Sequence, residues 1–118
     1  MADKKMTKAR LGELLPGWKV YVSGDDVELT RHSPAGEEVC VSLTLDTAAE
    51  MAKQASAYYN YFDPDDHAAQ IYHAKHYGSD DQQRFFTGAP DSLEDLVADA
   101  HAIDNLYYKI YEALNNAA

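Results

Sequence analysis

Histidines and carboxylates are the side chains of this sequence that could hold a metal ion. Three of the five histidines, His67, His73 and His76, fall within one predicted helix. At about 100° per residue, His73 and His76 project roughly 60° apart, and His67 points about 120° or more away from both. Three ligands from this helix therefore cannot converge, although a site made of His73, His76 and a distant acid stays open as an alternative. Since the sequence has no HExxH pattern, we predict solvated histidines and no metal or cofactor.

Nucleophilic chemistry has little support in the residue pattern. The one cysteine, Cys40, lies in an apolar, alternating segment, where we expect a buried and inert thiol. A single cysteine cannot close a disulfide within the chain, which is typical of a reducing cytoplasm. The sequence also contains no GxSxG motif, phosphate-binding glycine loop or dinucleotide fingerprint. We predict a protein that is not an enzyme, with a hydrolase using His and Asp as the least favoured alternative.

The charge balance restricts the class of partner. Twenty acidic residues oppose ten Lys and Arg, and four of those ten lie in the first ten positions, so the chain from Leu11 onward carries a net charge of −13. Direct nucleic-acid binding needs concentrated Lys and Arg, and a charged partner of this chain should instead be basic. No apolar segment reaches the roughly 18 to 20 residues of a membrane span, and the N-terminus lacks the apolar region of a secretory signal. We expect a cytoplasmic protein.

The first half of the chain predicts a short helix followed by a small sheet. Residues 7–15 have helical spacing of leucines and end at Pro16 and Gly17. Three segments then alternate apolar and polar residues, as half-buried strands do, and are joined by short turn sequences. The pattern predicts a three-stranded antiparallel meander within residues 18–45, with strands at 18–22, 27–32 and 39–45.

The second half, residues 46–115, is predicted to be helical and to cover that sheet. Asp46 is expected to cap a helix over residues 47–60, Asp63 and Pro64 to start one that ends at Gly78, and Ser92 to start the longest, over 92–115. The mixed polar residues of 79–90 predict a loop, which the adjacent aromatic side chains of Phe85 and Phe86 fix in place. We expect a single α+β domain spanning residues 1–118, with residues 1–6 disordered.

Two acids of the last helix fall inside its apolar arc. Asp99 projects between Leu106 and Ile110, and Asp104 between Leu93 and Val97. Because a bare buried carboxylate is costly, each must reach the margin of the arc or find donors such as tyrosine hydroxyls, the Trp18 indole, or Lys and Arg of the sheet. A place at the margin of the packed face is the simpler interpretation, and a partner-binding or homodimer role is the alternative.

Tyrosine is the remaining unusual feature, with nine in 118 residues. Two clusters, residues 58–62 and 107–111, hold adjacent tyrosines that diverge by about 100° on a helix, so they cannot all face one core. Some must form the edge of the core, and others are candidates for an interface.

A resemblance rests on Phe62-Asp63-Pro64-Asp65-Asp66-His67 and on the later segment Ser92 to Ile103. Both resemble a group of small acidic proteins from phages and other mobile elements of gut bacteria, which share an FDPD[DE]H helix start and a late S-L-x-x-L-x-x-D-A-x-x-I helix. The resemblance covers roughly residues 18–114. It implies a mobile-element context, in which short acidic proteins include anti-CRISPR inhibitors that mimic DNA with carboxylates.

The function that we expect is that of a non-enzymatic inhibitor, which binds a basic surface of a nucleic-acid-handling protein such as a CRISPR effector. The alternative is a small structural or regulatory protein of a mobile element that dimerises through its tyrosine-rich helices. The predicted partner-binding residues are nine acids and four tyrosines: Asp63, Asp65, Asp66, Asp80, Asp81, Asp91, Glu94, Asp95, Asp99, Tyr58, Tyr61, Tyr108 and Tyr111. A solubilising surface with helix caps is the simpler interpretation of the same acids.

Overall fold

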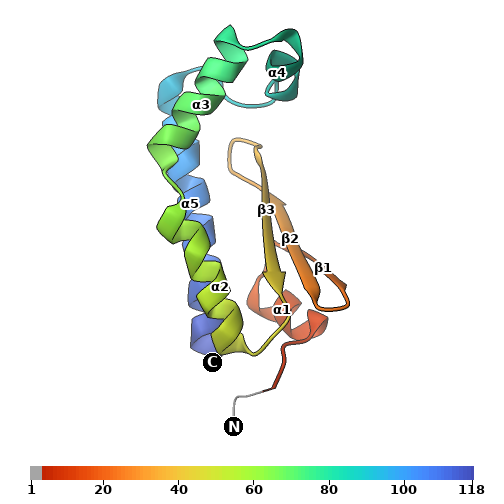
Figure 1. Cartoon of the computed structure of the whole chain (residues 1–118). Helices are drawn as coiled ribbons and strands as arrows, with labels where there is room; N and C mark the ends of the chain where they lie inside the picture. The colour runs from red at the N-terminus through yellow and green to blue at the C-terminus, as the bar shows by residue number, and fades with distance from the viewer. Residues whose placement is uncertain (1–3) are drawn as a thin grey trace.

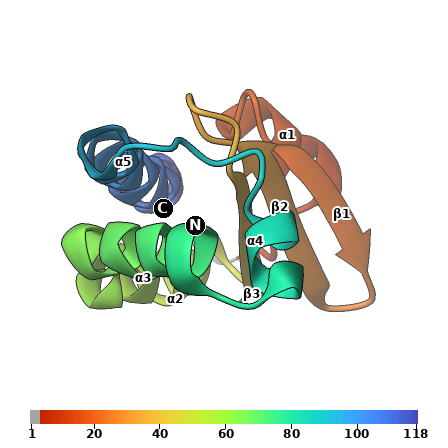
Figure 2. The same cartoon turned by 90° about the horizontal axis from the view of Figure 1, so that it is seen from above.

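The computed structural model describes residues 4–118 and has an α+β fold, in which a small antiparallel sheet lies beside a layer of helices (Figure 1). Seen along the long axis, α2, α3 and α5 form one layer, and the sheet with α1 forms the other (Figure 2). The elements follow in the order α1 (Lys8–Leu14), β1 (Lys19–Ser23), β2 (Asp26–His32), β3 (Glu38–Thr44), α2 (Ala48–Tyr61), α3 (Pro64–Tyr77), α4 (Asp80–Phe85) and α5 (Leu93–Ala117).

The predicted meander is confirmed, with strand order β1-β2-β3. Alternation puts Val27, Leu29 and Val41 on the face that packs against the helices, where each is at most 2% exposed. The turns between strands contain Gly24 and Gly36, whose φ angles of 60° and 97° are in the region that favours glycine. The opposite face of the sheet carries polar side chains and is open to solvent.

Side chains from α2 cover the free edge of β3. The Gln54 amide exchanges two hydrogen bonds with the Thr44 backbone, at 2.6 and 3.0 Å. The Tyr58 hydroxyl accepts from the Ser42 N–H at 2.9 Å and donates to the Ser42 carbonyl at 3.0 Å. These bonds satisfy backbone groups that would otherwise offer a template for another strand.

The helices α2 and α3 follow one another along α5 (Figure 1). Phe62 and Asp63 have extended backbone, and Pro64 begins α3 while the Asp63 carboxylate accepts from the Asp66 N–H, as the sequence predicted. Because α5 runs continuously past both helices, the molecule is elongated, with extents of 53 × 23 × 20 Å.

Two separate clusters of buried apolar side chains lie along α5. The main core joins α1, the sheet, α2 and the C-terminal half of α5, with Leu29, Met51 and Leu114 fully buried. The second is small and joins α3 to the N-terminal half of α5 through Ala68, Ile71, Leu96 and Ala100. The α3 end of the molecule therefore depends on a thinner core than the sheet end does.

Three details of the predicted helices and terminal segment are wrong. Thr47, not Asp46, caps α2, and the Asp46 carboxylate instead accepts from the Thr47 N–H. The predicted loop 79–90 contains α4, because Ser79 and Gln82 form a capping box. Within the segment 1–6, which was expected to be disordered, Lys5 forms an isolated antiparallel β-bridge with Thr47, and Met6 is buried. Residues 1–3 lie outside the described residues.

Candidate interaction surface

Most of the net charge lies at one end of the molecule. Residues 63–104, which we call the acidic arm, comprise α3, α4 and the N-terminal half of α5, and they hold ten acids and two basic residues. The arm thus carries eight of the ten net negative charges in about a third of the chain. Eight of its acids are exposed: Asp63, Asp65, Asp66, Asp80, Asp81, Asp91, Glu94 and Asp95.

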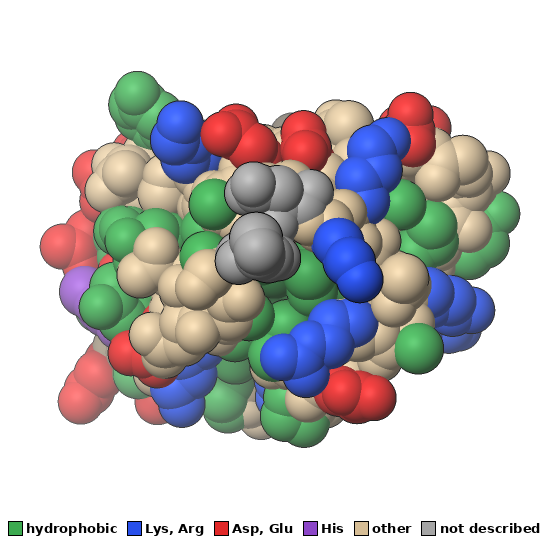
Figure 3. All heavy atoms as spheres, turned by 90° about the horizontal axis from the view of Figure 1, so that it is seen from below, with side chains coloured by type: hydrophobic (Ala, Val, Ile, Leu, Met, Phe, Trp, Pro, Cys, Tyr) green, Lys and Arg blue, Asp and Glu red, His purple; other side chains and the backbone are tan. Residues whose placement is uncertain are grey.

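The opposite end of the molecule carries most of the cations. Lys and Arg side chains lie on the face that holds the N-terminus, interspersed with acidic side chains (Figure 3). Lys8 and Arg10 come from α1, and Lys53 from α2. The chain therefore has a charge asymmetry along its long axis.

Local interactions occupy some acids of the arm and leave others free for a partner. Asp81 Oδ1 lies 3.6 Å from Arg84 Nη2, and Asp65 Oδ1 lies 3.2 Å from His101 Nε2. Among the described residues, the side chains of Asp80, Glu94 and Asp95 make no hydrogen bond or ion pair, so their charge is not neutralised locally.

Asp91 and Lys75 form the best-defined ion pair of the arm. Lys75 Nζ lies 2.7 Å from Asp91 Oδ1 and also donates to the Ala89 carbonyl. The hydrogen bond and charge of Lys75 lower the pKa of Asp91. This pair ties the segment before α5 to α3, so Asp91 has a structural role in addition to any contact with a partner.

A buried polar cluster joins the β2–β3 connection to the arm. Ser33 Oγ donates to Asp99 Oδ2 at 2.7 Å, and the Ala35 N–H donates to Asp99 Oδ1 at 3.0 Å. Ser33 Oγ also accepts from the Glu37 N–H at 2.9 Å, which fixes the turn. Asp99 is 4% exposed, yet its pKa is lowered, because these bonds and one from Glu37 outweigh the desolvation that would raise it.

Glu37 completes this cluster as a second carboxyl group. Its Oε1 lies 3.2 Å from His67 Nε2, while its Oε2 is buried without a hydrogen-bond donor among the described residues. Burial, opposed by the bond to His67 and reinforced by Asp99, raises the pKa of Glu37. A protonated Glu37 can donate to Asp99, so the two carboxyl groups share one proton most favourably.

Asp99, which the sequence places among the predicted partner-binding residues, is not exposed, unlike most other acids of the arm. It is buried, and its donors are a serine hydroxyl and a backbone N–H of the β2–β3 connection, neither of which the sequence indicated. Asp104 is half-buried, and its Oδ1 has no hydrogen-bond partner among the described residues. Sequence reasoning also missed Glu37, since nothing in the local pattern distinguishes it from the adjacent, exposed Glu38.

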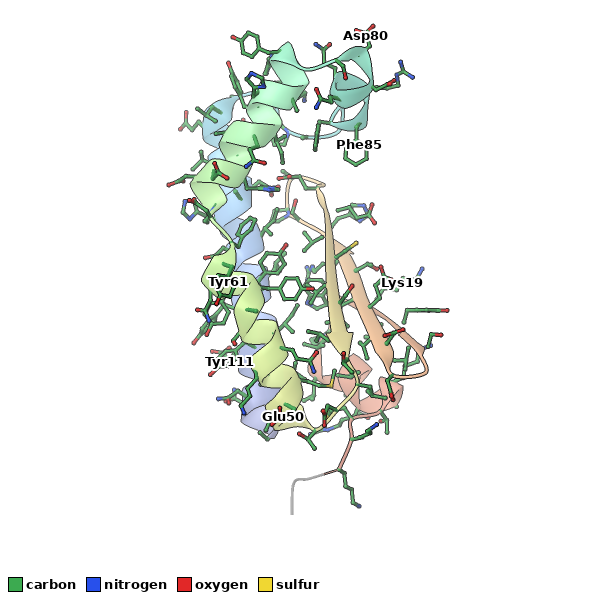
Figure 4. The ribbon with its side chains drawn as sticks, in the orientation of Figure 1. Lys19, Glu50, Tyr61, Asp80, Phe85 and Tyr111 are labelled. Carbon is green, nitrogen blue, oxygen red and sulfur yellow. The ribbon has the colours of Figure 1, made fainter. Side chains whose placement is uncertain are left out.

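The tyrosine clusters meet along the seam between α2 and α5. Tyr58 packs on Tyr107 with ring centroids 5.4 Å apart, and Tyr59 packs on Tyr108 and Tyr111 at 5.2 and 5.4 Å. Tyr61 is instead 87% exposed and points away from the sheet (Figure 4). Of the four tyrosines predicted to bind a partner, only Tyr61 and Tyr108, which is 43% exposed, present large free surfaces.

The histidines and the cysteine are dispersed over residues 4–118 and make separate local contacts. No group of three or more His, Cys, Asp or Glu in that range is arranged to hold a metal ion. His76 contacts the Asp91 carbonyl, and His73 packs on Tyr77.

Cys40 is exposed and not buried as predicted, because strand alternation puts it on the open face of the sheet. Desolvation and the Glu38 carboxylate raise the pKa of Cys40, which disfavours the thiolate.

Comparison of the chain with protein-family models, with curated proteins and with solved structures gives no match. Among the described residues, no helix has both the length and the apolar character needed to cross a membrane.

Proposed function

We propose that this chain is a non-enzymatic inhibitor whose acidic arm occupies a Lys- and Arg-lined nucleic-acid channel of a host defence protein, such as a CRISPR effector. The observation that carries this proposal is the concentration of eight exposed carboxylates in residues 63–104, at one end of an elongated molecule. A channel that binds nucleic acid has a high density of positive charge, to which such an arm is complementary.

The mechanism is electrostatic competition. Asp80, Asp81 and Glu94 are exposed near the end of the arm, and Figure 4 shows Asp80 at its tip. Exposed charges of this kind raise the association rate more than they lower the dissociation rate. Salt screens their interactions over about 8 to 10 Å near physiological ionic strength. Displacement of nucleic acid should therefore weaken steeply as salt is added.

The test measures displacement of labelled target DNA from a panel of guide-loaded CRISPR effectors by fluorescence anisotropy. An arm variant with Asp80→Asn, Asp81→Asn and Glu94→Gln removes three charges without removing an N-cap, since Ser79 and Ser92 cap α4 and α5. We expect this variant to displace DNA about tenfold less well than the wild type, through a slower association rate.

A matched control removes three charges from the rest of the molecule. Asp26, Glu28 and Glu112 are exposed and make no side-chain hydrogen bond or ion pair among the described residues. The variant Asp26→Asn, Glu28→Gln, Glu112→Gln has the same net charge as the arm variant. If both variants lose the same amount of DNA displacement, net charge alone explains the effect and the acidic arm has no special role. If the wild type displaces no DNA from any effector of the panel, the proposal is refuted.

Dimerisation through the tyrosine-rich helices has less support, because most of those rings pack against one another within the chain. Sedimentation velocity distinguishes the two hypotheses. A stable dimer that Tyr61→Ala together with Tyr108→Ala converts to monomer would favour the alternative.

A further inference from the structure

A cavity opens where the β2–β3 connection meets the acidic arm. Its volume is about 370 Å³, at the small end of the range of roughly 300 to 1,000 Å³ for ligand sites, so it suits a single long side chain. Pro34 and Ala35 form one wall, and Ala98 and Ala102 of α5 form another. Pro90, just before α5, also lines it.

The cavity combines these apolar walls with two carboxyl groups. Asp95 and Asp99 lie four residues apart on α5, on the same face of the helix, and both line the cavity. Asp95 is exposed, and Asp99 is 4% exposed. Among the described residues, no Lys or Arg forms an ion pair with either of them.

The charge of Asp99 is held by hydrogen bonds, and the nearby His67 also lowers its pKa. The donors to Asp99 are a protonated Glu37, the Ser33 hydroxyl and the Ala35 N–H, and these bonds lower the pKa of Asp99, which favours its ionised form. A carboxylate has about four lone-pair sites, so Asp99 has acceptor capacity left after these three bonds. A negative charge of this kind in an apolar-walled cavity is most strongly stabilised by a cation that enters it.

We infer that this cavity is a receptor for an arginine side chain of the basic partner, an inference that rests on the proposed function and specifies its anchoring contact. The aliphatic stem of arginine packs on the alanine and proline walls, and the guanidinium reaches the two carboxylates. Arginine fits better than lysine because its planar fork pairs with carboxylates in a bidentate way and is more weakly hydrated.

The experiment is an NMR titration of the full chain with two blocked tripeptides, acetyl-Gly-Arg-Gly-amide and its citrulline counterpart. Citrulline has nearly the same shape as arginine and no charge. We expect saturable shifts of the Ala35, Ala98 and Ala102 amides with the arginine peptide, at a millimolar Kd typical of one side chain. The citrulline peptide should bind at least about fivefold more weakly.

Two variants make the test specific. Asp95→Asn should weaken the arginine peptide about fivefold, whereas the charge-matched Asp26→Asn should leave its Kd unchanged within about twofold. Ala98→Leu fills the cavity without changing the charge, and leucine is a good helix former, so it should abolish the shifts while the protein stays folded.

Three outcomes would overturn the inference. They are equal binding of the arginine and citrulline peptides, equal weakening by Asp95→Asn and Asp26→Asn, and unchanged arginine binding by a folded Ala98→Leu protein. If Ala98→Leu still displaces DNA fully and the arginine peptide does not bind, the cavity has no such role although the proposed function stands. If the arginine peptide binds and the wild type displaces no DNA, the proposed function fails alone.

Discussion

The substitution Glu37→Gln should stabilise this protein at neutral pH. The side chain of Glu37 is 10% exposed, and its Oε1 faces His67 at 3.2 Å. Its Oε2 is buried without a hydrogen-bond partner among the described residues, and a hydrogen bond between Glu37 and Asp99 needs a proton on one of the two carboxyl groups. Glutamine keeps an acceptor for His67 and offers an N–H to Asp99, so it reproduces the protonated form of Glu37 at every pH.

The pKa shift gives the sign of the pH dependence. Because the folded pKa of Glu37 is raised, its contribution to stability is complete below its unfolded pKa of about 4.3 and is lost as pH rises through the folded value. Near pH 4 the wild type and Glu37→Gln should therefore unfold at nearly the same free energy. Above the folded pKa the variant should be the more stable.

The magnitude follows from the bond that ionised Glu37 cannot make. A hydrogen bond to a charged group contributes about 1.5 to 3 kcal/mol, and residual hydration and relaxation of the cluster reduce this to about 1 to 2 kcal/mol at pH 7.5. For a chain of this length, such a gain raises the Tm by roughly 3 to 10 °C.

Urea unfolding followed by circular dichroism between pH 4 and pH 8 measures this difference. Glu38→Gln is the control, because Glu38 is the exposed neighbour and lies outside the cluster. Its stability should stay within about 0.5 kcal/mol of the wild type at each pH. A Glu37→Gln protein that is less stable than the wild type at pH 7.5, or a difference that does not change with pH, would refute the reasoning.

Two other substitutions test contacts of the same framework. Asp99→Asn puts an amide N–H against the Ser33 hydroxyl or the Ala35 N–H and should cost about 2 to 3 kcal/mol in urea unfolding. The exposed Asp95→Asn should cost under about 0.5 kcal/mol, and equal effects would show that the bonds to Asp99 contribute little. Tyr58→Phe removes two hydrogen bonds from the edge of β3 and should cost about 1 kcal/mol and increase amide exchange at Ser42, whereas Tyr61→Phe, 87% exposed, should change neither; unchanged exchange at Ser42 would mean that the edge does not need Tyr58.

Local signals in the sequence were sufficient for most of the secondary structure. Asp63 and Ser92 cap α3 and α5 as predicted, since an N-cap depends on a side chain and an N–H only two or three residues away. Period-two alternation likewise located all three strands. The same alternation indicates the exposure of Cys40, although we predicted a buried thiol. Cys40 alternates with the buried Val39 and Val41 and so lies on the open face together with Ser42.

Aromatic residues outside long helices were harder to assign from sequence. Phe85 and Phe86 were both expected to hold their segment in place, but Phe85 is 81% exposed and only Phe86 packs on the second core. Leu93, at the first turn of α5, is likewise 44% exposed although it continues the apolar stripe. Periodicity gives the direction of a side chain from its own helix, and burial further requires a second element on that side.

The candidate site divides in the same way. Sequence alone determined that residues 63–104 are acidic and that caps and helix starts expose most of those acids, because charge and capping are properties of short segments. Only the tertiary structure brought Ser33, Ala35 and Glu37 to Asp99, across 62 to 66 positions of the chain, and opened the cavity beside them. The physical reason is that a buried carboxylate is stable wherever the fold provides donors, and those donors come from whichever distant element packs against it.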